Sequence, residues 1–311
     1  MPDIVISEFM DQDAVDAVSQ RYEVVYDAGL VDRPEELAGL LAEARALVVR
    51  NRTQVTAALL EAAPQLKVVG RLGVGLDNID TAACKARGVA VCPATGANDL
   101  AVAEWVIASA MLLFRLAFSA RAQVIDGLWP RGACMGRETA GKALGLVGFG
   151  NIAKETARLA RALGMRVLAY DPYVPADDPA WAGAQRFESL TALLAASDAV
   201  SLHVPLTDST RHLIDAAAIA AMKPGAILLN AARGGVVDED ALVGALRSGA
   251  LGGAALDVYE HEPLTQEYGQ RFAGLDNLIL TPHIGGVTVE SNERVSKLTM
   301  ENVVRVLEEG A

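Results

Sequence analysis

The chain has 311 residues, of which 52% are hydrophobic and 21% charged, and its formal net charge at pH 7 is −12. This composition is typical of a folded globular protein, and the length allows two domains with sizeable cores. We expect neither nucleic acid nor a membrane surface as a partner, because an acidic chain lacks the basic face that these polyanions require. A small anion can still bind where basic side chains collect.

The cysteines and the N-terminus indicate where the protein works. Cys84, Cys92 and Cys134 are too few for a disulfide framework, and no Cys/His spacing indicates a metal site, so we expect no metal and a reducing compartment. The N-terminus lacks the regions of a signal peptide. The longest apolar run, 105–114, is about half as long as a membrane-spanning helix. The expected location is the cytoplasm.

Short apolar segments alternate with amphipathic ones over the first hundred residues. The predicted strands are 3–7, 22–26, 46–49, 67–70 and 89–92, and the predicted helices lie near 11–19, 34–43, 55–62 and 79–86. Strands rich in β-branched residues that alternate with helices indicate a parallel sheet covered on both faces. A linker is predicted at 93–96, where this first series ends.

A long apolar helix is predicted from 98 to about 119, and we expect it to be buried between two lobes because no side of it suits water. A second series follows. Its six predicted strands are 142–150, 166–171, 198–204, 226–230, 252–258 and 277–283. Six strands make a complete doubly wound sheet. The last helix, 287–309, has no strand behind it, so we expect it to return to the first lobe.

The segment 145–153, GLVGFGNIA, follows a predicted strand and opens a predicted helix. There Gly148 permits a tight turn, Gly150 lets the backbone approach a pyrophosphate, and the helix N-terminus offers N–H groups to phosphate. The pattern alone is weak in a chain with 28 glycines. Asp171, 21 residues after Gly150, strengthens it, because a carboxylate there accepts hydrogen bonds from ribose hydroxyls and repels a 2′-phosphate. NAD is therefore predicted in preference to NADP.

Three polar side chains follow the ends of later predicted strands: Arg233, Glu262 and His283. The carboxyl ends of parallel strands lie at one edge, where open α/β sheets bind ligands. Reduction of a 2-oxo acid puts negative charge on the carbonyl oxygen, so its site needs a fixed cation and a proton donor. An arginine and a histidine paired with a carboxylate supply both. Singly, each of the three is more often a surface residue, and Glu260 competes with Glu262 for the acidic role.

The ordered segments VVRNRT, RLGVGLDNID, GLVGFGNIA, NAARGG, ALDVYEHEP and TPHIGG resemble the D-isomer-specific 2-hydroxyacid dehydrogenases, particularly phosphoglycerate-dehydrogenase-like members. The resemblance covers nearly the whole chain. It implies that Arg233 grips the carboxylate and carbonyl of the substrate, that His283 is the acid/base, and that Glu262, the Glu before Pro, pairs with His283.

The same resemblance implies an α/β fold of two doubly wound parallel-sheet lobes. A Rossmann NAD-binding domain, 98–285, is expected to be inserted in a flavodoxin-like substrate-binding domain, 1–97 plus 286–311. Two copies are expected to form a homodimer through the NAD-binding domain. His203 is expected beside the cofactor as strand-end structure.

Cofactor and substrate contacts are also implied residue by residue. The expected NAD-binding residues are Gly148, Gly150, Asn151, Ile152, Asp171, Val204, Pro205, Ala231, Asp257, Gly285 and Gly286, with Asp257 at the nicotinamide end. The expected substrate-binding residues are Arg50, Arg52, Arg71, Val74, Gly75, Asn98 and Arg131. Backbone N–H groups of 71–75 would meet the carboxylate, Arg50 would face the far end of the substrate, and Arg131 would reach a neighbouring subunit's site. Arg52 and Arg131 are equally well explained as solvated surface residues.

If these arginines converge, the substrate carries a second anion, either the phosphate of 3-phosphoglycerate or the sulfonate of (S)-3-sulfolactate. The latter has the spatial arrangement of a D-2-hydroxy acid, because sulfur changes the priority order at C2. The segment ATGAND at 94–99 and Arg52 depart from the phosphoglycerate pattern and leave the choice open. A glyoxylate/hydroxypyruvate reductase and an NAD-sensing, corepressor-like scaffold remain alternatives. A formate dehydrogenase is disfavoured, because it would carry Gln at position 262.

Overall fold

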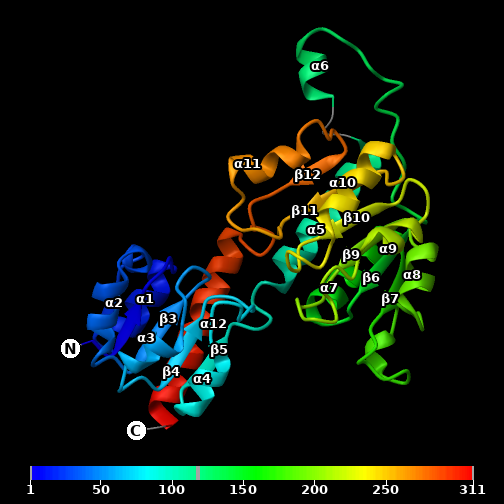
Figure 1. Ribbon diagram of the computed structural model, residues 1–311. Coiled ribbons are helices and arrows are strands. Elements are labelled where there is room, and N and C mark those ends of the chain that lie inside the picture. Colours follow the sequence, from blue (N-terminus) through cyan, green and yellow to red (C-terminus); the bar gives the residue numbers. More distant parts are fainter. Residues whose placement is uncertain (1, 117–119, 310–311) are drawn as a thin grey trace. The chain divides into compact units, whose positions relative to one another are not determined.

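The computed structural model describes residues 2–116 and 120–309 (Figure 1). The chain divides into two compact units, one formed by 1–98 with 287–311 and the other by 99–286. We call them unit 1 and unit 2. The predicted domain boundaries fall one residue before these divisions.

Unit 1 contains a five-stranded parallel sheet in the order β2-β1-β3-β4-β5. Its strands are β1 Ile4–Ile6, β2 Val24–Tyr26, β3 Ala46–Val49, β4 Val68–Arg71 and β5 Ala90–Pro93. Its helices are α1 Gln12–Ser19, α2 Pro34–Leu41, α3 Ala57–Glu61, α4 Thr81–Ala86 and α12 Val289–Glu309, with a 3-10 turn η1 at Leu30–Asp32. Every strand and helix predicted here is confirmed to within two residues at each end. The strand order is that of flavodoxin-like folds.

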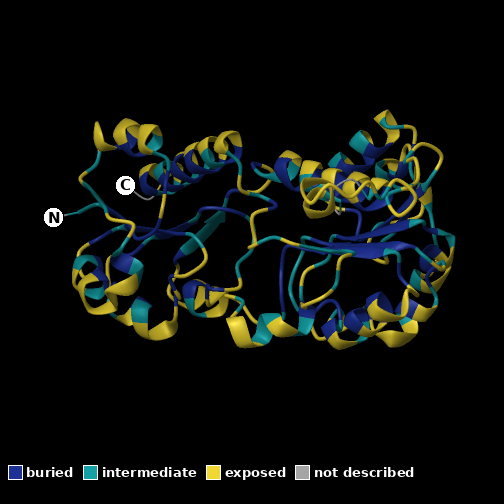
Figure 2. Cartoon of the chain, turned by 90° about the horizontal axis from the view of Figure 1, so that it is seen from above, coloured by how far each residue is buried: buried dark blue, intermediate teal, exposed yellow. Residues whose placement is uncertain are grey.

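The buried strands of unit 1 explain why their sequences are apolar without alternation. All four residues of β3 are buried, and successive side chains point to opposite faces of the sheet. Ala46 and Val48 join a core with residues of α1 and α12, whereas Leu47 and Val49 join one with residues of α2 and α3. Figure 2 shows buried strands between helices whose outer faces are exposed. The terminal helix α12 packs on β3, β4 and β5, as predicted.

Unit 2 contains a seven-stranded parallel sheet in the order β12-β11-β10-β9-β6-β7-β8. Its strands are β6 Ala143–Val147, β7 Arg166–Tyr170, β8 Gln185–Arg186, β9 Ala199–Leu202, β10 Ile227–Asn230, β11 Gly253–Leu256 and β12 Leu278–Leu280. Its helices are α5 Asp99–Arg115, α6 Arg121–Ile125, α7 Asn151–Ala162, α8 Leu190–Ala196, α9 Ala216–Ala220, α10 Glu239–Ser248 and α11 Gln266–Gly269, with 3-10 turns η2 Pro179–Trp181 and η3 Gln270–Phe272.

The predicted count of six strands is wrong, because β8 adds a seventh at the sheet edge. This strand is only Gln185–Arg186, and two polar residues give no apolar signal in the sequence. The order reverses between β6 and β9, which is the point where doubly wound sheets bind nucleotides. The predicted fold class, two doubly wound parallel sheets, is confirmed.

The long apolar helix is expected to be buried between two lobes, and in the structure unit 2 buries one of its sides. One side of α5 packs on α7, β10 and β11, and buries Val106, Ala110 and Leu113. The other side exposes Leu100, Met111 and Leu112, each 38–39% accessible. A single copy of unit 2 covers only one side of this helix, although apolar residues lie around it.

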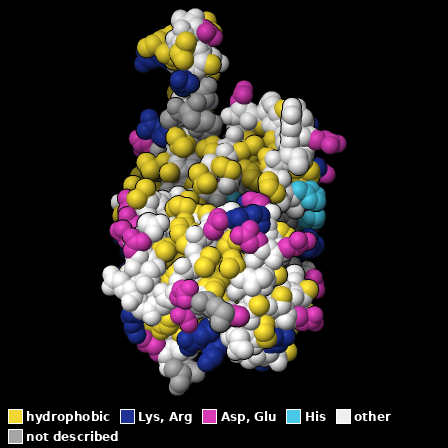
Figure 3. All heavy atoms as spheres, turned by 90° about the vertical axis from the view of Figure 1, so that its left-hand side faces the viewer, with side chains coloured by type: hydrophobic (Ala, Val, Ile, Leu, Met, Phe, Trp, Pro, Cys, Tyr) yellow, Lys and Arg dark blue, Asp and Glu magenta, His cyan; other side chains and the backbone are white. Residues whose placement is uncertain are grey.

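The segment 120–138, which includes α6, projects from the rest of unit 2 in Figure 1. Arg137 holds the end of this segment on the rest of unit 2. Its backbone N–H donates to the Phe114 carbonyl at 2.6 Å, and its guanidinium donates to the Gly225 carbonyl at 2.7 Å. The projecting segment exposes Ile125, Trp129 and Met135, which are 70–81% accessible. In Figure 3 the projecting part at the top shows hydrophobic side chains beside charged ones.

Within the described ranges, no helix is both long and apolar enough to cross a bilayer. The same residues contain no group of three or more His, Cys, Asp or Glu side chains that could hold a metal ion.

Candidate active site

The glycine-rich loop lies where the strand order of unit 2 reverses. Gly148 follows β6 with a φ of +87°, a conformation that suits glycine. A Cβ at this position would lie 2.5 Å from the carbonyl oxygen of His203, so β6 and the end of β9 approach closely only because Gly148 has no side chain. Gly150 caps α7 without a side chain, and nothing lies within 4 Å of the place of its missing Cβ. The N-terminus of α7, at Asn151 and Ile152, is thus open to a phosphate.

Asp171 lies directly after β7 and reaches the glycine loop. Its two carboxylate oxygens accept the Phe149 N–H and the Tyr173 N–H, both at 2.9 Å. Phe149 stands between the two loop glycines, so the predicted spacing of 21 residues does bring the carboxylate to the loop. Each oxygen keeps lone pairs for further donors, which fits the two hydroxyls of an adenosine ribose.

The other expected cofactor residues follow the carboxyl ends of neighbouring strands. Val204 and Pro205 follow β9, and Val204 Cγ1 would lie 3.0 Å from a Cβ on Gly148. Ala231 follows β10, Asp257 follows β11, and Gly285 and Gly286 follow β12. One edge of the sheet therefore carries all of them.

Glu262 and His283 form a pair in unit 2. His283 Nδ1 lies 2.7 Å from Glu262 Oε2, and the Tyr259 N–H donates to Glu262 Oε1 at 2.9 Å. Burial raises the pKa of Glu262, but the hydrogen bonds from His283 and Tyr259 and the positive charge of Arg233 outweigh it and lower the pKa overall. With Nδ1 directed at Glu262, His283 has Nε2 left for a substrate. Arg233 is close enough to act on Glu262, so the structure brings the three predicted catalytic residues together.

The loop that carries His283 is held by Asp257. This carboxylate is 1% exposed, and it accepts the Thr281 hydroxyl at 2.6 Å and the N–H groups of Ile284 and Gly285 at 2.8 and 2.7 Å. His283 has a φ of +56°, which is rare outside glycine and occurs where surrounding bonds impose it, often at functional sites. Asp257 thus fixes the conformation of the histidine loop.

Two other histidines are placed differently. His203 follows β9, and its Nε2 lies 3.0 Å from the Ser201 hydroxyl. Burial lowers the pKa of His203 to about 4, so the ring is neutral at pH 7, in keeping with the predicted strand-end role. His212 Nε2 lies 3.2 Å from Glu260 Oε1. Glu260, the alternative acidic residue, therefore pairs with a histidine other than His283.

Unit 1 has a hollow of about 470 Å³ at its own topological switch point, where β1 and β3 are neighbours. Ligands bind at such points in open α/β sheets. The lining residues are Glu8, Phe9, Ala28, Val31, Arg50, Asn51, Arg52, Val287 and Asn292. We call this feature the Arg50 hollow.

A buried carboxylate shapes the loop at this hollow. Glu8 is 4% exposed and accepts four backbone N–H groups, from Arg50, Asn51, Arg52 and Thr53, at 2.8–3.2 Å. Burial raises its pKa, but the backbone hydrogen bonds outweigh burial and lower the pKa overall.

Arg50 and Arg52 differ in what they contact. Arg50 Nη2 donates to Asn292 Oδ1 at 2.9 Å, and its guanidinium lies 5.8 Å from the centre of the Phe9 ring. Arg52 forms an ion pair with Asp32, and both side chains are more than half exposed. The contacts of Arg52 are thus those of a surface residue, although it also borders the hollow.

The remaining substrate candidates lie in both units. Arg71 ends β4, and its Nη1 donates to the Leu72 carbonyl at 2.7 Å. Val74 and Gly75 are half-buried in the loop that follows. Asn98 Oδ1 is buried without a hydrogen-bond partner among the described residues. Arg131 is exposed and belongs to the segment 120–138 of unit 2.

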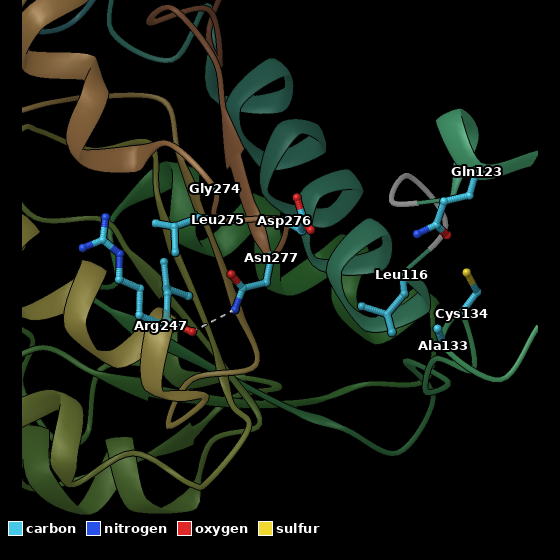
Figure 4. A pocket seen from close by; sticks show the side chains of 10 residues that line it. Leu116, Gln123, Ala133, Cys134, Arg247, Gly274, Leu275, Asp276 and Asn277 are labelled. Carbon is cyan, nitrogen blue, oxygen red and sulfur yellow. Dashed lines mark hydrogen bonds between the residues drawn. The ribbon is translucent and has the colours of Figure 1, made fainter. Parts of the chain in front are cut away.

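A second hollow, which lies in unit 2, does not belong to the candidate active site. Figure 4 shows it between side chains near α6, such as Gln123 and Cys134, and Arg247, Asp276 and Asn277. The last two directly precede β12, so the hollow lies at the amino edge of the sheet. Nucleotides bind at the opposite edge.

Several residues of the site have no motif of their own. Sequence reasoning missed Glu8, Phe9 and Asn292, and it did not assign Asp257 to the histidine loop. A buried position for Glu8 could have been suspected, because it directly follows the apolar strand DIVIS. The other contacts join residues far apart in the chain.

Asp171→Ala is expected to raise the KM for NAD about tenfold to a hundredfold, because charge-assisted hydrogen bonds to ribose contribute about 1.5–3 kcal/mol each. It should also reduce discrimination against NADP. The measurement is steady-state kinetics with both cofactors. Asp171→Asn is the control, because it removes the charge and keeps an oxygen for the Phe149 N–H. Unchanged KM values in both variants would contradict the assignment.

Glu8→Gln is expected to destabilise the protein by about 1–3 kcal/mol at pH 7, because an amide cannot accept all four N–H groups. Because folding lowers the pKa of Glu8, its ionised carboxylate stabilises the folded protein fully at pH values above the ordinary pKa of a glutamate. This stabilisation is lost as the pH falls through the lowered pKa. The difference in free energy of unfolding, measured with urea, should therefore shrink below about pH 4.5. Glu43→Gln, at an exposed acidic residue, serves as the control. A difference that stays constant down to the lowest pH would count against an ionised Glu8.

Comparisons with known proteins agree with this geometry. Residues 107–285 match the family model "D-isomer specific 2-hydroxyacid dehydrogenase, NAD binding domain". The chain is 55% identical over 307 residues to the (S)-sulfolactate dehydrogenase of Chromohalobacter salexigens, with 99% of both chains covered. It is 40% identical to the hydroxypyruvate reductase of Thermotoga maritima, with 97% of both covered. Among solved structures, the TT0316 protein of Thermus thermophilus matches with a TM-score of 0.89 and 35% identity, covering 98% of this chain and 97% of that one.

Proposed function

This chain belongs to the D-isomer-specific 2-hydroxyacid dehydrogenase family and is an NAD-dependent oxidoreductase, and from that premise we propose that its substrate pair is (S)-3-sulfolactate and 3-sulfopyruvate. The observation that carries the proposal is the 55% identity to an (S)-sulfolactate dehydrogenase over 99% of both chains. The Arg50 hollow supports it with a cationic side chain for a second anion.

The residues of unit 2 fit NAD. Gly148 and Gly150 leave the loop open to a pyrophosphate, and the lone pairs of Asp171 suit ribose hydroxyls. A carboxylate at this place disfavours the 2′-phosphate of NADP. Bound NAD supplies the acceptor for the hydride from C2 of the hydroxy acid.

The catalytic roles follow from the charges of the three residues. Arg233 binds the substrate carboxylate with its permanent, forked charge and stabilises negative charge on the C2 oxygen. During oxidation, Nε2 of His283 accepts the hydroxyl proton as the hydride leaves C2, and during reduction it returns that proton. Glu262 holds the ring through Nδ1 and stabilises the imidazolium, since Arg233 and His283 together keep the carboxylate ionised.

Arg50 is proposed to bind the sulfonate. Its guanidinium is held by Asn292 and lies over Phe9, so little side-chain entropy remains to be lost on binding. Arg52 has a weaker claim because Asp32 already pairs with it. Phosphate is an anion like sulfonate and would bind the same cationic side chain, so 3-phosphoglycerate is the nearest competing substrate.

The test measures NADH oxidation with 3-sulfopyruvate, phosphohydroxypyruvate, hydroxypyruvate and glyoxylate. We expect the highest kcat/KM with 3-sulfopyruvate. Arg50→Gln should lower that value at least tenfold and change the value for glyoxylate, which has no second anion, by less than twofold. Arg52→Gln is the matched control. A higher kcat/KM with phosphohydroxypyruvate would make the enzyme a phosphoglycerate dehydrogenase, and no preference for a second anion would favour a glyoxylate/hydroxypyruvate reductase.

A scaffold function predicts a different result. A corepressor-like protein would turn over none of these acids and would bind a protein partner only in the presence of NAD or NADH. Turnover without any partner excludes this alternative as the principal function.

We further propose that two copies form a dimer through unit 2 in the cytoplasm. The exposed apolar residues of α5 and the projecting segment are the support for the dimer, because monomers rarely leave so many large apolar side chains in water. The three free cysteines are consistent with a reducing compartment. Light scattering should give twice the chain mass, and Ile125→Ser with Trp129→Ser should reduce it to one chain. Cell fractionation tests the location.

A further inference from the structure

A third buried carboxylate, Glu239, lies at the first position of α10 and is 2% exposed. Its Oε1 accepts the Glu260 N–H at 2.8 Å, and its Oε2 accepts the Tyr268 hydroxyl at 3.0 Å. In return, Glu260 Oε1 accepts the Glu239 N–H at 3.3 Å. The two glutamates therefore join the start of α10 to residues 259–262 through reciprocal backbone hydrogen bonds.

Arg271 and His212 lie beside these two carboxylates. Arg271 Nη1 lies 3.6 Å from Glu239 Oε2 and 3.4 Å from Asp240 Oδ1, and it also donates to the Tyr268 hydroxyl at 2.9 Å. His212 Nε2 lies 3.2 Å from Glu260 Oε1. Burial, together with the charge of Glu260, raises the pKa of Glu239, and the hydrogen bonds from Glu260 and Tyr268 and the charge of Arg271 offset this rise only in part. The bonds of Glu239 therefore define one arrangement of the segment that it contacts.

That segment carries the catalytic pair. The residue before the anchored Glu260 is Tyr259, whose N–H donates to Glu262, and Glu262 in turn contacts His283. The loop that carries Arg233 packs on the segment 259–262, because a Cβ on Gly234 would lie only 1.7 Å from the Tyr259 carbonyl oxygen. Glu239 lies at the end of the loop that carries Arg233, where α10 begins. It therefore lies where the segments that carry Arg233 and Glu262 meet.

We propose that Glu239 is a positioning residue of the active site, which holds residues 259–262 so that the Glu262 carboxylate stays on Nδ1 of His283. It acts through the backbone N–H of Glu260. The inference rests on the proposed catalytic function of Glu262 and His283 and adds the residue that orients them.

The test compares Glu239→Ala with Glu239→Gln in the full-length protein. Glu239→Ala should lower kcat for 2-oxo acid reduction at least tenfold and change the KM for NADH less than twofold. The high-pH limb of its kcat profile should move to lower pH, because a displaced Glu262 carboxylate no longer stabilises the His283 imidazolium. Glu262→Gln, which removes that charge directly, should move the limb in the same direction. Glu239→Gln keeps an oxygen for the Glu260 N–H and should recover most of the rate. Tyr268→Phe, which leaves that hydrogen bond in place, should keep the parental limb.

Loss of thermal stability in Glu239→Ala with a parental kcat and pH limb would overturn the proposal, as would a Gln variant no better than Ala. If Glu239→Ala does not fold, Glu239→Asp replaces it, because its shorter side chain withdraws the carboxylate from Glu260. Glu267→Ala, an exposed acid on α11, is the control. If His283→Ala and Glu262→Gln keep the parental rate, the proposed function itself fails. If His283→Ala is inactive but Glu239→Ala keeps the parental kcat and pH limb, only the positioning role of Glu239 is overturned.

Discussion

Replacing His283 by Ala is expected to lower kcat by about 10²–10⁴-fold in both directions, the usual contribution of a general acid–base residue. The physical reason is the loss of the only proposed proton carrier at C2, since Nδ1 of this ring is directed at Glu262 and Nε2 is left for the substrate. The measurement is single-turnover reduction with NADH at saturating 2-oxo acid, which reports the chemical step directly.

The His283 experiment needs a control for loop structure, because this residue has a φ of +56° and Asp257 holds its neighbours. Binding of NADH, followed by fluorescence, should stay within about threefold of the parent if the loop keeps its shape. His261→Ala is the matched control, since that exposed ring packs on Tyr268 at 4.7 Å between centres. A His283 variant that binds NADH normally and keeps more than a tenth of the parental rate would remove His283 from proton transfer.

Replacing Arg233 by Ala is expected to lower kcat/KM for the 2-oxo acid about 10³-fold or more, through a higher KM and a lower kcat. One part is lost binding of the carboxylate, and the other is lost stabilisation of the C2 oxygen, where a single well-placed donor is worth about 10²–10³-fold. Arg233→Lys keeps the charge but not the planar fork, so it should recover only part of the loss.

The KM for NADH separates the proposed role of Arg233 from damage to the fold, and it should change little. Arg211→Ala is the control, since this exposed arginine lies on the neighbouring loop after β9. A variant that raised only the KM for the acid, with kcat intact, would limit Arg233 to ground-state binding and contradict a role in stabilising the transition state.

The structure shows two kinds of acidic residue at functional loops. Glu262 contacts the candidate proton carrier, whereas Glu8, Asp257 and Glu239 accept backbone N–H groups of loops that carry functional residues. Such acids contribute to function by fixing backbone conformation, which a charged acceptor does more strongly than a neutral one. Substitutions at these positions should therefore affect activity without a direct contact to substrate.

The sequence by itself determined the fold class and most of the elements, and it singled out the three residues that we propose as catalytic. Strands and helices in this family fold are signalled locally, by β-branched runs and by glycines next to them, and Arg233, Glu262 and His283 stand in short segments at strand ends. The two-residue β8 and the exposed side of α5 could not be predicted, because the first has no apolar pattern and the second depends on which neighbours cover it.

Only the tertiary structure decided which polar groups meet. Arg50 and Asn292 are 242 positions apart, Glu8 and Thr53 are 45 apart, and Glu239 and Glu260 are 21 apart, so no local pattern connects them. The tertiary structure also distinguished Arg50, which borders a hollow and bonds to Asn292, from Arg52, which pairs with Asp32 on the surface, although only one residue separates the two in VVRNRT. A net charge of −12 left room for an anionic substrate, and folding is what fixes the direction of a charge such as that of Arg50, because Asn292, far away in the chain, accepts its hydrogen bond.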